Sequence, residues 1–155
     1  MNIEIPGYGT LHINHVVMDY NGTLAVDGLP AAGVPAALEK LAGSLDLHVL
    51  TADTFGRAAA EIKDLPCRLS ILPRGDQAGA KRDYVKHLGA EQTAAVGNGR
   101  NDRMMLETAV LGICVLLEEG AAVQTLQSAD VVCPSIVSAL DLLASPLRLT
   151  ATLRS

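Results

Sequence analysis

The sequence predicts an α/β fold: a single doubly wound domain over residues 1–155, with a central parallel sheet preceded by an N-terminal hairpin. Two observations predict it. Short aliphatic runs without polar alternation recur along the chain, and segments with the apolar spacing of helices separate them. Strands that are apolar on both faces and are joined through helices form parallel sheets with helices on both sides. The length of 155 residues suits one such domain.

The elements are expected in the following order. Alternating apolar residues on either side of "PGYG" predict the hairpin; they are Ile3, Ile5, Leu11 and Ile13. The aliphatic runs that follow predict the strands of the sheet; they are "HVVM", "LHVL", "RLSIL", "TAAV" and "VLGICVLL". Among the helices, one is expected to start near Phe55 with Asp53 or Thr54 as its cap, and another to run from Asp76 to Gly89.

Composition and charge exclude several classes of protein. The net charge is −5 with only 12 Lys and Arg, and no basic run is present, so we expect no nucleic-acid partner. The longest apolar run, near residues 109–117, is too short to cross a bilayer, so we expect no membrane partner. The three cysteines are odd in number and widely spaced, which favours free thiols in a reducing cytoplasm.

Polar residues follow the predicted strands, where open α/β sheets bind their ligands. "DYNGTL" follows the first central strand, "TADT" the next, and "GNGRND" the fourth, while "GDQAGAKRD" opens a helix. These segments supply the carboxylates of Asp19 and Asp102, the hydroxyl of Thr51 and the ammonium of Lys81. This is the set of groups that phosphoryl transfer through an aspartyl phosphate requires.

The chemistry assigns a task to each group. A carboxylate nucleophile repels a phosphate, so it needs a bridging cation and donors around the phosphoryl oxygens. Mg²⁺ accepts oxygen ligands, which Asp19 and either Asp102 or Asn98 would supply. Thr51 and Lys81 would donate to the phosphoryl group. Gly22 allows the backbone to turn closely under the phosphate, so that N–H groups point at it.

The order of the motifs "DYNGT", "LTAD", a lone lysine opening a helix and "VGNGRND" resembles the haloacid dehalogenase superfamily. Within that superfamily the chain resembles the phosphorylation domain of P-type ATPases, whose pattern is DKTGT with a late GDGxND. The resemblance extends from about Val16 to the last helix. It implies that Asp19 is phosphorylated and that the backbone carbonyl of Asn21 and the motif from Asn98 to Asp102 hold Mg²⁺.

The same resemblance implies the remaining site residues. The catalytic set is Asp19, Asn21, Thr51 and Lys81, and the metal ligands are Asp19, Asn21, Asn98 and Asp102. The phosphate-binding set is Gly22, Thr51, Ala52, Lys81 and Asn101. Arg100 and Arg103, beside the late motif, are interpreted as solvated charges.

Two departures from the pattern bear on activity. The typical phosphatase has an Asp where this chain has Asn21, and the ATPase-like late motif has an Asp where this chain has Asn98. An amide cannot exchange a proton near pH 7, so we expect slow hydrolysis. Loss of a carboxylate at position 98 is expected to weaken metal binding.

No cap domain is expected, because only 27 residues separate Thr23 from Thr51 and only 29 separate Thr51 from Lys81. Since the site is uncapped and the chain begins in an exposed hairpin, a homo-oligomer is expected in which a neighbour partly covers the site. The leading hypothesis is a Mg²⁺-dependent phosphohydrolase or phosphotransferase that acts on a small phosphorylated substrate or phosphodonor. The alternative is a non-catalytic or regulatory module that binds phosphate and Mg²⁺.

Overall fold

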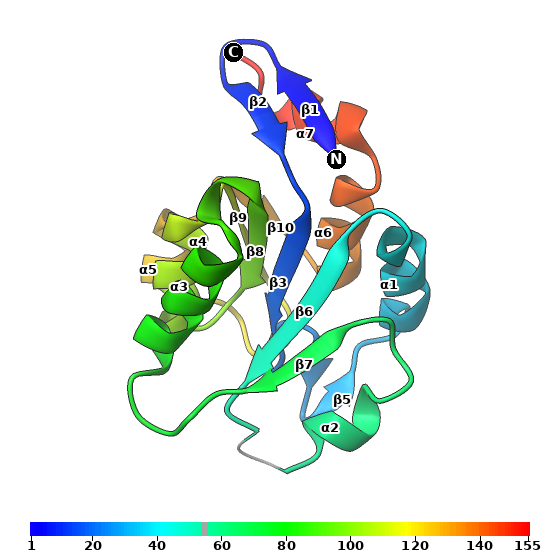
Figure 1. Cartoon of the computed structure of the whole chain (residues 1–155), viewed down its shortest axis with the longest axis vertical. Helices are drawn as coiled ribbons and strands as arrows, with labels where there is room; N and C mark the ends of the chain where they lie inside the picture. The colour runs from blue at the N-terminus through cyan, green and yellow to red at the C-terminus, as the bar shows by residue number, and fades with distance from the viewer. Residues whose placement is uncertain (54–55) are drawn as a thin grey trace.

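The central sheet contains six parallel strands within the described residues, which are 1–53 and 56–155 of this computed structural model (Figure 1). Their order across the sheet is β10-β9-β8-β3-β6-β7. Their bounds are β3 His15–Asp19, β6 Asp46–Thr51, β7 Arg68–Ile71, β8 Thr93–Gly97, β9 Leu111–Val115 and β10 Val131–Cys133. The five predicted strands are present, and β10 is an additional strand that was not predicted. The predicted parallel sheet is therefore confirmed.

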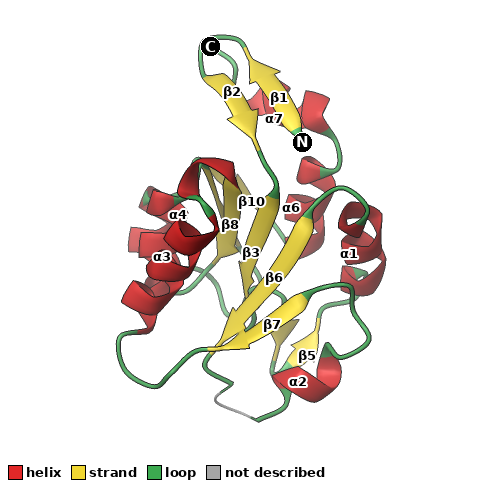
Figure 2. Cartoon of the chain, viewed as in Figure 1, coloured by secondary structure: helices red, strands yellow, loops and turns green. Residues whose placement is uncertain are grey.

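Helices cover both faces of the sheet (Figure 2). One face carries α1 (Val34–Ala42) and α6 (Ile136–Leu143), and the other carries α3 (Gln77–Leu88) and α4 (Arg103–Thr108). Helix α7 (Pro146–Leu153) packs on α6 and β1, and α5 (Val123–Gln127) packs on α4. Strand β3 shows why both faces are buried. Val16 and Met18 point into the core with α1 and α6, and Val17 points into the core with α3 and α4. All three are fully buried, which explains the lack of polar alternation.

The N-terminal hairpin is also confirmed, as β1 (Asn2–Ile5) paired antiparallel with β2 (Gly9–His12). The expectation that it is exposed is wrong for its apolar face. Its alternating apolar residues are all buried; they are Ile3, Ile5, Leu11 and Ile13. The hairpin packs against α7, and both chain termini lie at this end of the molecule (Figure 1). The Ser155 N–H donates to the Pro6 carbonyl at 3.2 Å, which ties the C-terminus to the hairpin turn.

A second, shorter hairpin follows β3 and was not predicted. It consists of β4 (Ala25–Val26) and β5 (Leu29–Pro30), and the Tyr20 hydroxyl donates to the Gly28 carbonyl at its turn, at 2.9 Å. Between Thr23 and β6, the chain holds only this hairpin and α1. The described residues between β6 and α3 hold α2 (Ala58–Glu61) and β7. These two intervals contain no cap domain among the residues described.

The helix expected to start near Phe55 corresponds to α2, which begins at Ala58. Thr54 and Phe55 lie outside the described residues, so the Thr54 cap is not described. The Asp53 carboxylate accepts a hydrogen bond from the Ala58 N–H at 3.1 Å, at the first residue of α2. The helix expected from Asp76 is α3, where Asp76 accepts from the Gly79 N–H at 2.9 Å. Two short 3₁₀ turns, η1 (Ala90–Gln92) and η2 (Arg100–Asp102), complete the elements described.

Within the part of the chain that the structure describes, no single helix has the length and hydropathy of a membrane span. Helices α6 and α7 reach that measure only when joined, and they meet at a bend of 100°.

Candidate active site

Most of the predicted site residues lie at one edge of the sheet. Asp19 is the last residue of β3, Thr51 is the last residue of β6, and Asn98 directly follows β8. Lys81 lies in the second turn of α3. Because parallel strands end on the same side, residues that are far apart in the chain meet here. This edge is the lower end of the molecule in Figure 1.

A buried ion cluster occupies the centre of this edge. The Lys81 ammonium Nζ lies 2.6 Å from Asp19 Oδ1 and 2.6 Å from Asp102 Oδ1. Lys81 is 1% exposed and Asp102 is fully buried. Two carboxylates and one ammonium leave a formal charge of −1 among these three groups. An ammonium buried here is stable because both neighbours are anionic.

The burial and the mutual charges shift the pKa values of this cluster. Burial, and after it the negative charge of Asp102, raises the pKa of Asp19 to about 7, although Lys81 opposes the shift. Burial alone lowers the pKa of Lys81, but the charges of Asp102 and Asp19 outweigh it and the net shift is upward. Lys81 is therefore cationic at neutral pH. A second cation beside Asp19 would favour its ionised, nucleophilic form.

Asp102 organises the late motif. Its second oxygen, Oδ2, accepts from the N–H groups of Asn98 at 3.0 Å and Gly99 at 2.8 Å. Since Oδ1 is bound to Lys81, both carboxylate oxygens are used within the protein. Each carboxylate oxygen keeps a further lone pair, so the expected role of Asp102 as a metal ligand stays a prediction. In this structure Asp102 holds Lys81 and the loop in place.

The Asn98 side chain connects two loops. Its Oδ1 accepts from the Thr23 hydroxyl at 3.1 Å, and its Nδ2 donates to the Gly120 carbonyl at 2.9 Å. Thr23 is fully buried. An Asp at position 98 could keep the first hydrogen bond but not the second, because a carboxylate has no N–H to donate. Asn98 thus fixes the loop after β3 to the loop after β9.

Gly22, in the loop after β3, lies close to side chains of both neighbouring loops. Its φ is +76°, and a Cβ there would lie 2.6 Å from Asn98 Nδ2 and 2.8 Å from Glu119 Oε2. The positive φ and these close contacts require a glycine at this position. The expected close turn under a phosphate stays a prediction, and the Gly22 N–H itself donates to the Ala25 carbonyl at 2.7 Å. The turn after β3 uses this N–H to close itself.

Other donors are available for a phosphoryl group. Thr51 Oγ1 accepts from the Asp53 N–H at 2.9 Å and from Asn21 Nδ2 at 3.4 Å, so its own proton remains to be donated. The backbone N–H groups of Asn21 and Ala52 make no hydrogen bond to the described residues. These groups surround the end of β3, where Asp19 lies.

Asn101 lies beside this centre, and its expected role in phosphate binding stays a prediction. Its Nδ2 donates to Gln77 Oε1 on α3, at 2.9 Å. This contact joins η2 to the first turn of α3.

Comparison with known proteins adds one relative at the level of sequence. No family model matches the chain. An uncharacterized protein of Methanocaldococcus jannaschii is 52% identical over 84 residues, which are 52% of this chain and 90% of that protein. The chain belongs to the family of this archaeal protein. The alignment leaves about half of the present chain without a counterpart there.

Solved structures show the fold that this family member adopts. A cobalt-bound deoxy-D-mannose-octulosonate 8-phosphate phosphatase from Haemophilus influenzae has a TM-score of 0.70 at 19% identity, covering 88% of this chain and 91% of that one. The 3-deoxy-D-manno-octulosonate 8-phosphate phosphatase from Moraxella catarrhalis, with magnesium, phosphate and KDO, has a TM-score of 0.66 at 20% identity, covering 92% and 94%. The predicted haloacid dehalogenase-like fold is confirmed.

A zinc-transporting PIB-type ATPase has a TM-score of 0.60 at 24% identity, covering 79% of this chain but only 20% of that one. Both phosphatases and an ATPase thus share the fold. These matches support the superfamily fold without singling out the ATPase-like branch within it.

The residues of this family member fit a divalent cation in part. Among residues 1–53 and 56–155, no three His, Cys, Asp or Glu side chains converge on a metal position. Asp19 has a second carboxylate oxygen that Lys81 does not bind, the Asn21 carbonyl accepts no hydrogen bond from the described residues, and the Asn98 amide oxygen, which accepts from Thr23, keeps a further lone pair. These are hard oxygen donors of the kind that Mg²⁺ binds while it keeps several waters. The donor set fits such an ion but contains few carboxylates.

Thr23 and Glu119 were not predicted as site residues from the sequence. Thr23 was within the quoted "DYNGT", but its partner Asn98 is 75 residues away. Glu119 follows an aliphatic strand at a distance of several residues, and nothing local marks it. The Glu119 carboxylate reaches this site beside Gly22, where its Oε2 would lie 2.8 Å from a Cβ.

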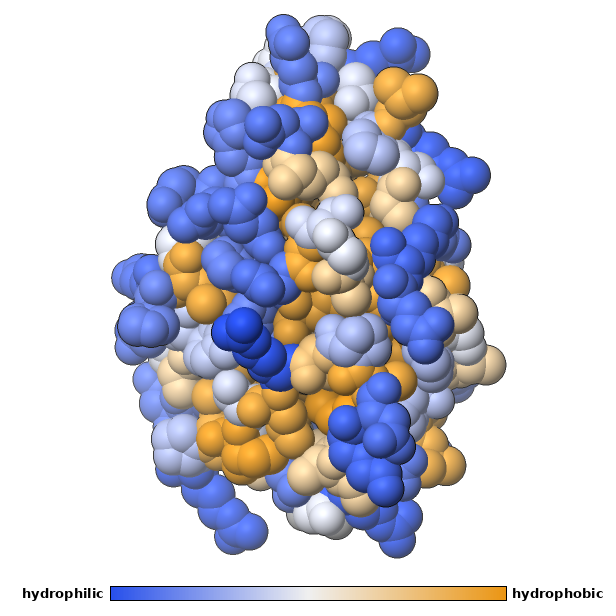
Figure 3. Space-filling model, turned by 45° about the vertical axis from the view of Figure 1, so that its right-hand side comes forward, coloured by the Kyte–Doolittle hydropathy of each residue, from blue (hydrophilic) through white to orange (hydrophobic). Residues whose placement is uncertain are grey.

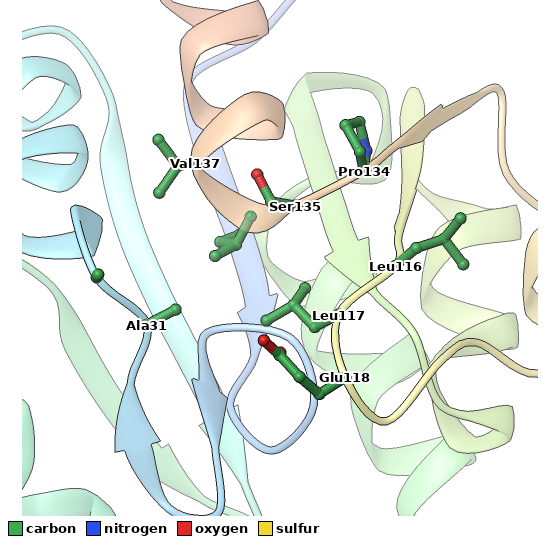
Figure 4. Close-up of a pocket in the computed structure, with 9 residues that line it drawn as sticks. Ala31, Leu116, Leu117, Glu118, Pro134, Ser135 and Val137 are labelled. Atoms are coloured by element: carbon green, nitrogen blue, oxygen red, sulfur yellow. The ribbon is translucent and has the colours of Figure 1, made fainter.

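A pocket of about 440 Å³ adjoins the site through the segment 116–120. Figure 4 shows Ala31 and Val137 on one side of it, Leu116 and Pro134 on the other, and Glu118 at its lower margin. Figure 3 shows further apolar side chains at the lower end of the molecule, and Leu29 and Ile71 are 55% and 53% exposed. The surroundings of the site are therefore partly apolar.

Proposed function

We propose that residues 1–155 form a Mg²⁺-dependent phosphohydrolase or phosphotransferase domain that acts through an aspartyl phosphate on Asp19. One observation carries the proposal. Asp19 ends the central strand, Lys81 holds one of its oxygens at 2.6 Å, and the Thr51 hydroxyl ends the neighbouring strand. The similarity in fold to phosphatases with bound metal supports it.

The proposed reaction consists of two displacements at phosphorus. In the first, an Asp19 oxygen forms a bond to phosphorus as the bond to the leaving oxygen breaks, and Lys81 and Thr51 donate to the phosphoryl oxygens. The leaving oxygen takes its proton from water, because Asn21 has none to give near pH 7. In the second, water attacks phosphorus, its proton passes to solvent, and the Asp19 carboxylate and inorganic phosphate are released.

The cation would be held by Asp19, the Asn21 carbonyl and the Asn98 amide oxygen. When bound, Mg²⁺ supplies the charge that lets a carboxylate approach a phosphate dianion. The protein contributes orientation. The Asn98 contacts to Thr23 and Gly120 fix the loop that carries the Asn21 carbonyl, and Gly22 keeps that loop close to Asn98.

The alternative function is a non-catalytic or regulatory module that binds phosphate and Mg²⁺. Two amides favour it, since the typical phosphatase has an Asp at position 21 and the ATPase-like late motif has an Asp at position 98. Both hypotheses predict phosphate binding, and they differ in whether Asp19 becomes phosphorylated.

Incubation with radiolabelled acetyl phosphate and Mg²⁺ separates the two. We expect an acid-stable, hydroxylamine-labile label on Asp19, lost in Asp19→Asn and kept in Asp64→Asn, which changes an exposed carboxylate. A broad screen of phosphate esters then tests turnover. Bound phosphate without label in the folded wild type would support the regulatory module instead.

We also propose a cytoplasmic homo-oligomer in which a second copy partly covers the site. The exposed apolar residues Leu29 and Ile71 near the open site support this arrangement, and the free cysteines suit a reducing compartment. Light scattering at micromolar concentration is expected to show a species larger than the monomer. A monomer alone contradicts it.

A further inference from the structure

A second pocket lies on the α3 side of the site and plays no part in the reaction described above. Its volume is about 410 Å³, and it lies between the start of α3 and the turn η2 with the start of α4. Its lining includes Gly75, Gln77, Arg100, Asn101, Arg103 and Met104.

The two walls of this pocket continue into the catalytic centre. On α3, Gln77 precedes Lys81 by four residues, so the two side chains lie on one face, about 6 Å apart along the axis. On the other wall, Asn101 immediately precedes Asp102. The two walls join twice, through Asn101 and Gln77 at 2.9 Å and through Lys81 and Asp102 at 2.6 Å. The pocket therefore lies about one helical turn from the ammonium of Lys81.

The pocket contains cationic groups without protein partners. Arg100 and Arg103 are exposed, and neither forms an ion pair with any described residue. By contrast, Arg82 on α3 pairs with Asp83 at 2.8 Å. The acidic residue in the lining, Asp76, accepts a hydrogen bond from the Gly79 N–H as the cap of α3. Two guanidinium groups thus face a concave site in a chain whose net charge is −5.

We propose that this pocket binds a second anionic group of the substrate, a carboxylate or a phosphate, through Arg100 and Arg103. The guanidinium fork matches both anions in geometry. The substrate class is then a small phosphate monoester with a second anion a few bonds from the phosphorus that Asp19 attacks. Met104 and Ala78 supply apolar contacts for the carbon skeleton between the two charges. The inference rests on the proposed function for the position of the first phosphate, and it replaces the interpretation of both arginines as solvated charges.

Calorimetry on the Asp19→Asn protein, which cannot turn over, tests the proposal. The ligands are glycerol 3-phosphate with one anionic group, 3-phosphoglycerate with an added carboxylate, and propane-1,3-diyl bisphosphate with an added phosphate, each with Mg²⁺. We expect at least one ligand with two anionic groups to bind about tenfold more tightly than glycerol 3-phosphate, since hydrogen bonds to charged groups contribute strongly. Which of the two is preferred identifies the anion.

The preference for ligands with two anionic groups should weaken when Arg100→Gln or Arg103→Gln is added alone. It should disappear when both are added. Arg154→Gln changes an exposed arginine near the C-terminus and should leave it intact. Equal affinities for the three ligands, no measurable binding, or a preference that survives both substitutions would overturn the proposal. Calorimetry on the Asp19→Asn protein measures binding without turnover. Absence of the acetyl phosphate label in the wild type would therefore count against the proposed function alone.

Discussion

The α3 side of the site and the side facing the loop after β9 present different groups to Asp19. On the α3 side, the ammonium of Lys81 contacts two carboxylates at 2.6 Å each and is buried. On the other side, Asn98 offers a neutral amide that is already bound to Thr23 and Gly120. The α3 side thus carries the buried ammonium that is expected to stabilise Asp19 and a bound phosphate. The side of Asn98 carries no carboxylate in its place, so it has less negative charge with which to hold a cation.

Under the proposed function, this difference predicts which step of the reaction is slow. With Asn at positions 21 and 98, the site has two fewer carboxylates than the pattern with Asp at both. Fewer negative charges reduce the repulsion of an incoming phosphate, but they also weaken the attraction for a cation and remove the proton shuttle. We therefore expect phosphorylation by reactive donors to persist while turnover is slow.

The largest effect is expected on the α3 side of the site, at Lys81. Lys81→Met removes the ammonium and leaves Asp19 and Asp102 buried without a counter-ion, which costs about 3–5 kcal/mol of unfolding free energy. Labelling by acetyl phosphate should be lost as well. The stability loss should be smaller at pH 5 than at pH 8, because protonation of Asp19 removes one of the two negative charges.

Denaturant unfolding of Lys81→Met at both pH values measures this effect. Lys40→Met is the matched control, because Lys40 and Asp141 form an exposed pair at 3.2 Å, and its loss should change stability by less than about 1 kcal/mol. Equal stability of the two variants would show that Lys81 is not the counter-ion of the cluster.

The sequence predicted most of the fold because the sheet is buried on both faces. Residues such as Val16 and Val17 point to opposite cores, so an unbroken aliphatic run was sufficient to identify β3. Strand β10 has only three residues and gave too short a run. The hairpin β4–β5 was missed because each of its strands has two residues. Its stability depends on contacts such as that of the Tyr20 hydroxyl.

The candidate site was predicted less evenly. Asp19, Lys81 and Asp102 meet as the order of the motifs implied, although the first two lie 62 positions apart in the chain. The engagement of Asp102 by two backbone N–H groups could not be predicted, since it depends on how η2 folds. The Gly22 N–H was expected to face a phosphate. The turn itself uses that donor, and a motif does not show such local competition.

The next largest effect is expected from Asn21→Asp. Asn21 Nδ2 lies 3.4 Å from Thr51 Oγ1, so a carboxyl group here is near the phosphoryl donors. It can protonate the leaving oxygen and then accept a proton from the attacking water. General acid–base assistance is worth at least about 10²-fold. We expect the phosphoenzyme lifetime to shorten and turnover of alkyl phosphates to rise.

Pulse-labelling followed by a chase at saturating Mg²⁺ gives the lifetime. Asn14→Asp changes an exposed amide elsewhere and should leave the lifetime unchanged. If folded Asn21→Asp protein loses label no faster than the wild type, Asn21 is not what limits turnover and the regulatory module is favoured.

A smaller effect is expected from Asn98→Asp. The substitution removes the hydrogen bond to the Gly120 carbonyl and adds a carboxylate close to Glu119, so the metal-free protein should lose about 1 kcal/mol of stability. Mg²⁺ should restore it, because the added carboxylate is a better ligand than an amide. Thermal unfolding with and without Mg²⁺ measures both changes. A variant that Mg²⁺ stabilises no more than the wild type contradicts the placement of the cation. Addition of Asn98→Asp to Asn21→Asp should raise turnover above that of either single variant.

The smallest effect is expected at Glu119, whose carboxylate lies within 2.8 Å of the position that a Gly22 Cβ would occupy. If a cation binds between Asp19 and Asn98, this exposed charge attracts it through water, and such an interaction is worth only about 1 kcal/mol or less. Glu119→Gln should therefore weaken Mg²⁺ affinity a few-fold, as measured by competition with Mn²⁺ in electron paramagnetic resonance.

Glu118→Gln is the matched control, because Glu118 lines the pocket on the other side of the same loop. The effect should diminish as salt is raised, since an exposed charge is screened. In the Asn98→Asp background, Glu119→Gln should raise the stability of the metal-free protein, because removal of the Glu119 charge relieves its repulsion from the new carboxylate. Equal Mg²⁺ affinities for Glu119→Gln and Glu118→Gln would place the cation away from the loop after β9. The amide at Asn98 would then be explained by its hydrogen bonds to Thr23 and Gly120 alone.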